Sequence, residues 1–280
     1  MTTTAIRQDL NLQSWAKHCF GLPQKRWEAL AKSKVWITGA GTGFGLSMAA
    51  ALAAAGGQVF LSGRRAAKLE EALGFIRSLG ISAERCVPIP CDVRDETSVR
   101  AAVATIGASA GSLFGLINNA ALPMRDRRPA PLAAIDATGW RDLVETNVTG
   151  PWLVTRAALP LLASASAGRV IFVTSEAGWA FTPGHGPYNM SKAALNNLGA
   201  SFAAECAAAY PDRDLQINVL VPGEARTEMN QASDVSPDAV VPMTLALLSH
   251  PSGGPNGCFF HRDGRHLAFA YAVPYAKPLL

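Results

Sequence analysis

The sequence predicts an α/β fold in which a doubly wound parallel sheet of about seven strands carries helices on both faces. Three observations lead to this prediction. Short apolar runs rich in β-branched residues alternate with longer segments of helical periodicity along most of the chain. The apolar runs are continuous rather than alternating, as is typical of parallel strands buried on both sides. A glycine-rich turn follows the first apolar run directly and opens the first helix.

The strands follow from the apolar runs, taken in chain order. Val35-Trp36-Ile37 comes first, immediately before the glycines. Pro88 lacks an N–H group, so the third run is expected at an edge of the sheet or at a strand end. The expected strands are 35–37, 58–62, 86–89, 114–117, 169–174, 215–221 and 257–261.

The helices follow from apolar residues at three- and four-residue spacing between the strands. The longest pattern, 140–162, contains Gly150-Pro151, where we expect a disturbance of the helix. Ser236-Pro237 suits an N-cap followed by the first helical residue. The expected helices are 47–55, 66–79, 95–106, 140–162, 188–209 and 237–248.

One domain, residues 34–265, accounts for this alternation, since the sequence has no internal repeat or low-complexity linker. Residues 1–33 are expected to be an N-terminal extension that packs on the domain. The apolar tail, residues 266–280, is expected to lie at a subunit contact. With 49% hydrophobic and 16% charged residues, the 280-residue chain has the composition of an ordinary globular protein.

Composition argues against several other classes of protein. The net charge is only +4, and Asp126 interrupts the one basic run, 125–128, so no nucleic-acid partner is expected. Five cysteines without a CxxC pair predict neither a disulfide framework nor a zinc site. The spacing in 261–266 fits no standard zinc motif, and no metal is expected. No apolar run reaches the roughly 18 residues of a membrane span, so we expect a cytoplasmic protein with no membrane partner.

The glycine-rich turn carries the first functional signal. It reads Thr38-Gly39-Ala40-Gly41-Thr42-Gly43-Phe44-Gly45 between the first strand and the first helix. Glycines let the backbone approach a pyrophosphate closely, and a helix N-terminus adds free N–H groups and partial positive charge. The expected cofactor-binding residues of the turn are Gly39, Gly41, Thr42, Gly43, Phe44 and Gly45.

The spacing TGxxxGxG resembles that of the short-chain dehydrogenase/reductase family, in its compact single-domain branch. The resemblance implies a Rossmann-like fold and hydride transfer between a nicotinamide cofactor and a carbonyl or alcohol. The resemblance extends over about 230 of the 280 residues, because further motifs follow in the family's order.

The end of the second strand bears on which nicotinamide cofactor is bound. It reads Ser62-Gly63-Arg64-Arg65, with two guanidinium groups and no carboxylate to bind a ribose 2′-OH. Arginine suits a 2′-phosphate. We therefore expect NADP(H), with NAD(H) as the alternative, and Arg64 and Arg65 near the phosphate.

Two further segments resemble the family's cofactor contacts. Asp92 and Val93 match its adenine-contacting pair, and Asn119 lies in a segment similar to the family's NNAG. Ala121 stands where that motif has glycine, and a left-handed backbone there would cost about 1 kcal/mol.

The expected catalytic group centres on Tyr188 and Lys192, which share one helical face as an i, i+4 pair. A nearby ammonium favours the phenolate and lowers the tyrosine pKa. Ser175 lies thirteen residues before Tyr188, at the end of the fifth strand. The resemblance implies that Tyr188 is the proton donor and acceptor and that Ser175 orients the substrate oxygen. It also implies that Lys192 binds the nicotinamide ribose and that Asn147 holds a water of a proton relay.

The resemblance also covers the segment after the sixth strand. Pro222, Gly223 and Thr227 match the family's PGxxxT and imply contacts to the nicotinamide. Trp179 and His185 precede Tyr188 and are expected, with Ser175 and Tyr188, to contact substrate. The short segment 228–236 predicts an open site that admits bulky or carrier-bound substrates.

Together these features predict an NADP(H)-dependent oxidoreductase that interconverts a carbonyl and an alcohol. A 3-oxoacyl-carrier-protein-type reductase is an alternative within this class. A catalytically inactive NADP(H)-binding regulator is an alternative outside it, although such proteins typically lack the tyrosine or the lysine. The resemblance further implies a homo-tetramer or a homo-dimer.

Overall fold

The sheet is built as the sequence predicts. The computed structural model describes residues 19–124 and 129–268, which leaves the basic run 125–128, most of the N-terminal extension and most of the tail outside the described residues. Within these residues, seven parallel strands form one sheet in the order β3-β2-β1-β4-β5-β6-β7. They are β1 (Lys34–Thr38), β2 (Gln58–Gly63), β3 (Cys86–Pro90), β4 (Gly115–Asn118), β5 (Ala167–Val173), β6 (Asp214–Val221) and β7 (Phe259–His261). The strand that contains Pro88, β3, lies at an edge.

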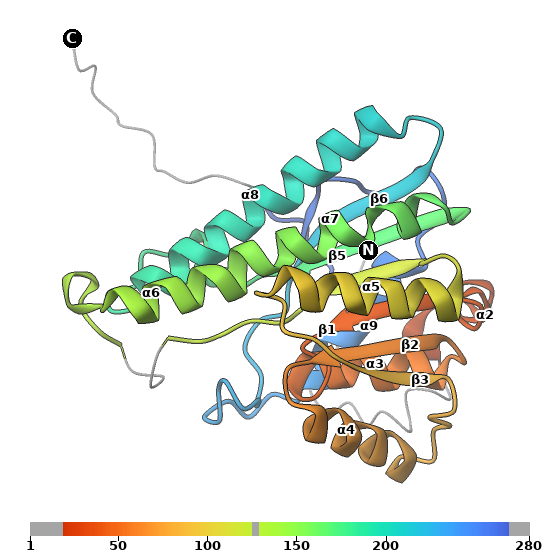
Figure 1. The fold of residues 1–280 in the computed structure, drawn as a ribbon, viewed down its shortest axis with the longest axis horizontal. Coiled ribbons are helices and arrows are strands. Elements are labelled where there is room, and N and C mark those ends of the chain that lie inside the picture. Colours follow the sequence, from red (N-terminus) through yellow and green to blue (C-terminus); the bar gives the residue numbers. More distant parts are fainter. Residues whose placement is uncertain (1–18, 125–128, 269–280) are drawn as a thin grey trace.

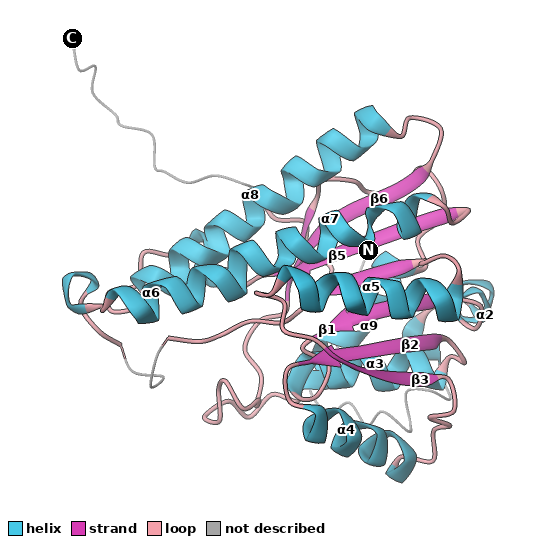
Figure 2. Ribbon diagram, in the orientation of Figure 1, coloured by secondary structure: helices cyan, strands magenta, loops and turns pink. Residues whose placement is uncertain are grey.

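Helices cover both faces of the sheet (Figures 1 and 2). The α-helices are α2 (Gln24–Leu30), α3 (Gly43–Ala54), α4 (Ala66–Ser78), α5 (Glu96–Ala110), α6 (Ala137–Val144), α7 (Gly150–Ala163), α8 (Gly186–Ala209) and α9 (Val241–Leu248). Short helical segments are η1 (Cys19–Gly21), η3 (Leu132–Ala134), η4 (Glu145–Thr149), η5 (Glu176–Trp179) and η6 (Pro237–Val240). In Figure 1, α5, α7 and α8 lie in front of the sheet, with α3 and α9 behind it.

Alternating strand residues divide the core between the two faces, because successive side chains of a strand point in opposite directions. In β1, Val35 and Ile37 join a buried cluster with α3, α4 and α9. Trp36 joins a second cluster with α5, α7 and α8. All three side chains are fully buried. Both faces are therefore apolar, which explains why the strands read as continuous apolar runs.

Two expected elements differ in detail. The long helix changes to a π-helical turn at Glu145–Thr149, one turn before the expected Gly150-Pro151. Pro151 accounts for this position, because a proline supplies no N–H to the carbonyl four residues earlier, which belongs to Asn147. The seventh strand begins at Phe259 rather than at Gly257, whose φ of +71° is incompatible with extended backbone.

The N-terminal segment docks on α9 through Arg26. Its guanidinium donates to the carbonyls of Ser249 (3.1 Å) and Ala246 at the carboxyl end of α9. A cation at this position satisfies carbonyls that have no partner within the helix. The sequence pattern predicted packing of this segment but not the contact that fixes it.

The strand order predicts a ligand-binding crevice at the carboxyl ends of β1 and β4. These two strands are neighbours, and the chain winds outward from them in opposite directions. In doubly wound sheets, ligands bind where the winding reverses, outside the carboxyl ends of the strands. The turns after β1, β4, β5, β6 and β7 all lie along this edge of the sheet.

Candidate active site

The glycine turn after β1 is shaped by backbone contacts that leave no room for side chains. Gly39 and Gly43 have φ values of +67° and +54°, which L-residues rarely adopt. A Cβ on Gly45 would lie 2.3 Å from the Gly39 carbonyl oxygen. Thr42 is extended and α3 begins at Gly43, so the first amides of the helix face the crevice edge without helical partners. The residues fit a phosphate-binding cradle.

Asn119 fixes the glycine turn across the point where the winding reverses. Its Nδ2 donates to the carbonyls of Thr38 (3.0 Å) and Gly39 (3.1 Å). The Thr38 hydroxyl accepts from the backbone amides of Asn119 (3.0 Å) and Ala120 (3.1 Å). Ala121 is not among the described non-glycine residues with positive φ, so alanine costs no left-handed strain there.

The two arginines after β2 have different surroundings. Both are exposed. Arg65 forms a 2.8 Å ion pair with Glu228, which follows Thr227. Arg64 makes no hydrogen bond or ion pair with any residue that the structure describes, although its charge helps to lower the pKa of Asp92. Arg64 is therefore the more available guanidinium for an added anion.

Asp92 and Val93, after β3, are both held by protein contacts. The Asp92 carboxylate accepts from the Arg94 guanidinium at 2.7 and 3.1 Å, and this hydrogen bonding holds its pKa below the usual value. Val93 is buried, and a Cβ on Gly150 would approach it to 2.7 Å. The structure thus places this pair just beyond the carboxyl end of β3 and engages the Asp92 side chain in a contact within the protein.

Ser175, Tyr188 and Lys192 come together at the carboxyl end of β5. Ser175 caps η5, accepting from the Ala177 amide at 3.1 Å, and its side chain is hydrogen-bonded to Tyr188. Tyr188 lies in the first turn of α8, and the Lys192 Nζ lies 5.6 Å from the centre of its ring. Lys192 is 3% exposed, and its Nζ donates to the Val173 carbonyl at 3.2 Å. These three expected catalytic residues therefore form one group.

Burial determines the pKa values of the pair. Desolvation raises the pKa of Tyr188 to about 12; the hydrogen bond with Ser175 opposes this shift and the charge of Glu176 adds to it. Desolvation also lowers the pKa of Lys192 to about 8. The shift of Tyr188 is opposite to the one expected from a neighbouring ammonium, because desolvation of the phenolate is the largest contribution.

Asn147 is anchored beside this group by its own hydrogen bonds. It is fully buried in the π-helical turn η4. Its Oδ1 accepts from the Leu122 amide (2.7 Å), and its Nδ2 donates to the Leu122 carbonyl (3.0 Å) and to Ser191 Oγ (3.1 Å). Ser191 directly precedes Lys192, so Asn147 connects the chain after β4 to the catalytic helix. Single π-turns within helices are frequent at functional sites.

The segment after β6 reaches back to the glycine turn. Gly223 has a φ of +66°, and a Cβ there would lie 2.9 Å from the Cζ of Arg262. The Thr227 hydroxyl accepts from the amides of Met229 (3.2 Å) and Asn230 (3.1 Å). A Cβ on Gly43 would lie 3.1 Å from the Thr227 methyl group. Pro222, Gly223 and Thr227 thus border the same crevice as the glycine turn.

The two expected substrate contacts differ in their surroundings. Trp179 packs edge-on against Phe259, with ring centres 5.9 Å apart, as part of the second core cluster. His185 precedes α8 and is partly exposed. Two apolar side chains nearby are strongly exposed, Phe181 (82%) and Leu132 (60%), and sequence reasoning did not single out the second of them. A Cβ on Gly186 would lie 2.8 Å from Leu132, which places η3 against the start of α8.

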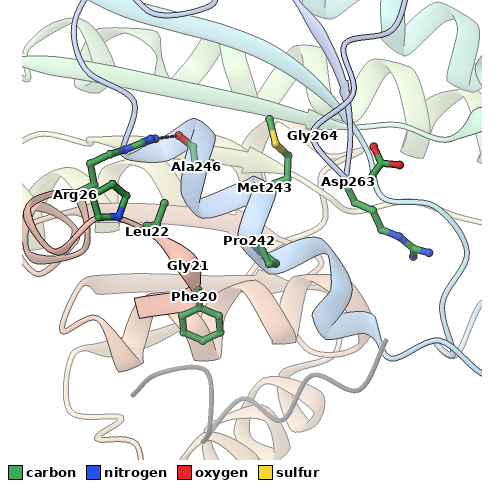
Figure 3. A pocket seen from close by; sticks show the side chains of 11 residues that line it. Phe20, Gly21, Leu22, Arg26, Pro242, Met243, Ala246, Asp263 and Gly264 are labelled. Carbon is green, nitrogen blue, oxygen red and sulfur yellow. Dashed lines mark hydrogen bonds between the residues drawn. The ribbon is translucent and has the colours of Figure 1, made fainter. Parts of the chain in front are cut away.

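A cavity of about 270 Å³ lies away from these groups (Figure 3). None of Asn147, Ser175, Tyr188 or Lys192 lines it. It is lined by Phe20, Gly21, Leu22, Pro23, Arg26, Pro242, Met243, Ala246, Arg262, Asp263 and Gly264. Among the described residues, no group of three or more His, Cys, Asp or Glu side chains is arranged to hold a metal ion. None of the described helices combines the length and apolarity that crossing a membrane requires.

A glycine turn at the reversal of winding, next to a serine–tyrosine–lysine group, indicates a dinucleotide-dependent α/β enzyme. The sequence profile described as short chain dehydrogenase matches residues 33–237. The chain therefore belongs to the short-chain dehydrogenase/reductase family. It is an oxidoreductase that acts on CH–OH or C=O groups.

Individual relatives support this assignment. The chain is 33% identical over 203 residues to gluconate 5-dehydrogenase of Gluconobacter oxydans, covering 72% of this chain and 75% of the relative. A short chain dehydrogenase structure from Salmonella enterica serovar Typhi superimposes with a TM-score of 0.75 at 26% identity, covering 86% and 99% of the two chains. The actinorhodin polyketide ketoreductase with NADPH gives 0.72 at 25% identity, covering 82% and 95%.

Proposed function

We propose that this chain interconverts a carbonyl and an alcohol with NADP(H), and that Tyr188 donates and accepts the proton. The observation that carries this proposal is the convergence of Ser175, Tyr188 and Lys192 at the carboxyl end of β5. Tyr188 and Lys192 come from one face of α8, and Ser175 comes from the loop after β5, where it caps η5. Lys192 is only 3% exposed, and a pair of residues on the surface would not require this burial.

The residues present fit a bound dinucleotide. The glycine turn offers backbone amides where a Cβ has no space, and Thr227 packs against Gly43 at the start of α3. Lys192 is positioned one helical turn from Tyr188, where its ammonium would bind the ribose hydroxyls of the dinucleotide. The remaining proposed contacts are Gly39, Gly41, Thr42, Gly43, Phe44, Gly45, Arg64, Arg65, Asp92, Val93, Asn119, Pro222 and Gly223.

The bound nicotinamide supplies or accepts the hydride. In carbonyl reduction, the Tyr188 hydroxyl gives its proton to the oxygen of the forming alkoxide. Ser175, hydrogen-bonded to Tyr188, orients that oxygen and stabilises its developing charge. A pKa of about 12 keeps Tyr188 protonated at neutral pH, which suits a proton donor. In alcohol oxidation Tyr188 must instead be deprotonated, and positive charge beside the ring favours this form.

Proton resupply follows the buried contacts behind Tyr188. Lys192 has a pKa lowered to about 8, so it exchanges protons near neutral pH. Asn147 is held rigidly beside Ser191, next to Lys192 in sequence. Pro151 supplies no N–H to the Asn147 carbonyl in the α-helical register, so this carbonyl suits the binding of a relay water.

The preference for NADP(H) rests on the exposed guanidinium groups after β2. Arg64 has no ion-pair partner among the described residues, and no carboxylate occupies the positions after β2 that would bind a ribose 2′-OH. A 2′-phosphate gains charge-assisted hydrogen bonds there. Higher catalytic efficiency with NADH than with NADPH would contradict this preference.

The substrate side is open and apolar. Phe181 and Leu132 are strongly exposed beside the start of α8, next to His185. We propose a substrate with an apolar portion, either a small ketone or alcohol or a carrier-bound 3-oxoacyl group. Exposed Trp140 and Trp152, on α6 and α7, support a homo-oligomer, dimeric or tetrameric.

The test is turnover of a panel of ketones, sugars and 3-oxoacyl thioesters, followed by NADPH absorbance. We expect activity in the wild-type protein, a loss of at least about a thousandfold in Tyr188→Phe, and near-normal activity in the control Tyr210→Phe. Tyr210 ends α8 and lies far from the group in sequence. NADPH binding without turnover of any panel member would favour the inactive regulator. Retention of turnover by Tyr188→Phe would overturn the assigned role of Tyr188.

A further inference from the structure

Two consecutive residues at the end of β7 each contact a different loop of the proposed active site. β7 is the edge strand next to β6, and its last residue is His261. His261 reaches the loop after β5, which carries Ser175. Arg262 reaches the loop after β6, which carries Pro222 and Gly223. These two loops lie on either side of the bound nicotinamide in the proposed function.

Arg262 holds the loop after β6 through its carbonyls. Its Nη1 donates to the carbonyl oxygens of Pro222 (3.0 Å) and Glu224 (2.7 Å). The guanidinium lies so close to Gly223 that a Cβ there would be 2.9 Å from Cζ. The two hydrogen bonds of Nη1 thus hold the carbonyls of the residues before and after Gly223, whose backbone is left-handed. Hydrogen bonds from a charged donor are stronger than neutral ones.

His261 holds the loop after β5 through Glu176, the residue after Ser175. Its Nε2 lies 3.2 Å from Glu176 Oε1, and its Nδ1 lies 2.8 Å from Asp263 Oδ2. The imidazole is 13% exposed, whereas Glu176 is 57% exposed. Arg265, which also contacts Asp263, completes the set of charged groups around the ring. A mostly buried imidazole therefore ties an otherwise exposed glutamate to the end of β7.

We propose that His261 and Arg262 are positioning residues, with His261 fixing the serine loop and Arg262 fixing the Pro222–Glu224 loop. The inference rests on the proposed function, because it assigns Ser175 to the substrate oxygen and the second loop to the nicotinamide. The inference predicts that the two residues affect different steps. Loss of Arg262 weakens cofactor binding, whereas loss of His261 slows the chemical step and leaves cofactor binding intact.

The first experiment needs no substrate. Arg262→Met and His261→Leu are compared with wild type by hydrogen exchange and mass spectrometry on the full chain. We expect faster exchange of residues 222–227 in Arg262→Met only, and of residues 175–180 in His261→Leu only. Arg213→Met, an exposed arginine at the other end of β6, is the control and should change neither. Equal changes in both loops, or no change in either, would overturn the inference.

The second experiment separates binding from chemistry. NADPH titration by fluorescence should give a Kd about tenfold higher for Arg262→Met and an unchanged Kd for His261→Leu. With a substrate from the panel, His261→Leu should lower kcat about fivefold. Arg262→Lys and His261→Gln, which keep a donor, should recover part of each effect. Because Glu176 carries the His261 contact, adding Glu176→Gln to His261→Leu should cause little further loss.

The outcomes distinguish this inference from the proposed function. Absence of turnover in wild type contradicts the proposed function. The hydrogen-exchange experiment still tests the two contacts, because it asks only whether each variant loosens its own loop. If the wild type turns over and both variants show an equally raised Kd and an equally lowered kcat, only the assignment of separate effects to the two residues is contradicted.

Discussion

The Nη2 of Arg65 lies 2.8 Å from the Oε2 of Glu228, so the end of β2 is joined to the segment that follows Thr227. These residues are 163 positions apart in sequence. Both side chains remain about half exposed. The pair therefore spans the proposed nucleotide crevice, and a 2′-phosphate bound there would compete with Glu228 for Arg65.

Substitution of Glu228 by glutamine is expected to strengthen NADP⁺ binding. It removes a carboxylate that neutralises Arg65, and exposed ion pairs are worth up to about 1 kcal/mol. The Kd for NADP⁺ should fall up to about fivefold, and the Kd for NAD⁺ should hardly change. Calorimetric titration of both cofactors measures this, with Glu70→Gln on α4 as the control. Weaker NADP⁺ binding in Glu228→Gln would show that Glu228 assists rather than competes.

Arg64 is expected to contribute more to NADPH binding than Arg65. Arg64 is exposed without an ion-pair partner in the described chain, whereas Arg65 must first leave Glu228. Arg64→Ala should raise the KM for NADPH about tenfold or more and Arg65→Ala about threefold, since a charge-assisted hydrogen bond contributes about 1.5–3 kcal/mol. The KM for NADH should change little in either variant. A larger effect in Arg65→Ala would reverse the order that the structure supports.

Local signals in the sequence were sufficient for the fold. Seven apolar runs gave seven strands, because both faces of the sheet are buried and each run is continuous. Pro88 indicated the edge position of β3 through its missing N–H. The family motifs were sufficient to predict that Ser175, Tyr188 and Lys192 lie close together, because each stands at a fixed position at the end of β5 or on α8.

Contacts between distant loops were beyond the reach of these signals. The contacts of Arg262 with Pro222, and of His261 with Glu176, depend on which loops meet at the carboxyl edge of the sheet. Isolated charged residues in loops carry no periodicity, so their partners are not predictable from spacing. The direction of the Tyr188 pKa shift was also missed, because it depends on burial rather than on the neighbouring lysine.

Gly45 is expected to tolerate no side chain. A Cβ there would lie 2.3 Å from the Gly39 carbonyl of the same turn and 2.6 Å from Asn119 Nδ2, which holds the turn from the end of β4. Gly45→Ala should lower the free energy of unfolding by about 1–3 kcal/mol and abolish NADPH binding. Gly74→Ala is the matched control, since a Cβ at that helical glycine meets nothing within 4 Å. It should stabilise the protein by about 0.5–1 kcal/mol in urea unfolding. An unaffected Gly45→Ala variant would contradict the close approach.

Lys192 is expected to reduce stability at neutral pH as a consequence of its burial. Its pKa falls from 10.5 to about 8 on folding, because desolvation disfavours the ammonium. As the pH falls from about 10.5 to about 8, the unfolded chain takes up the proton first, so the native state loses stability through this window. Below pH 8 both states are protonated at this site, and the loss is complete.

Lys192→Met should therefore have a higher free energy of unfolding than wild type at pH 7, by up to about 3 kcal/mol. It should unfold at a higher urea concentration, and its turnover should be lost. The advantage should shrink as the pH approaches 10, where the wild-type lysine is neutral in the native state. Urea unfolding of both proteins across this range measures the difference, and Lys32→Met, an exposed lysine, should show no such trend. A Lys192→Met protein that is less stable than wild type at pH 7 would mean that the hydrogen bond to Val173 outweighs the desolvation of the ammonium.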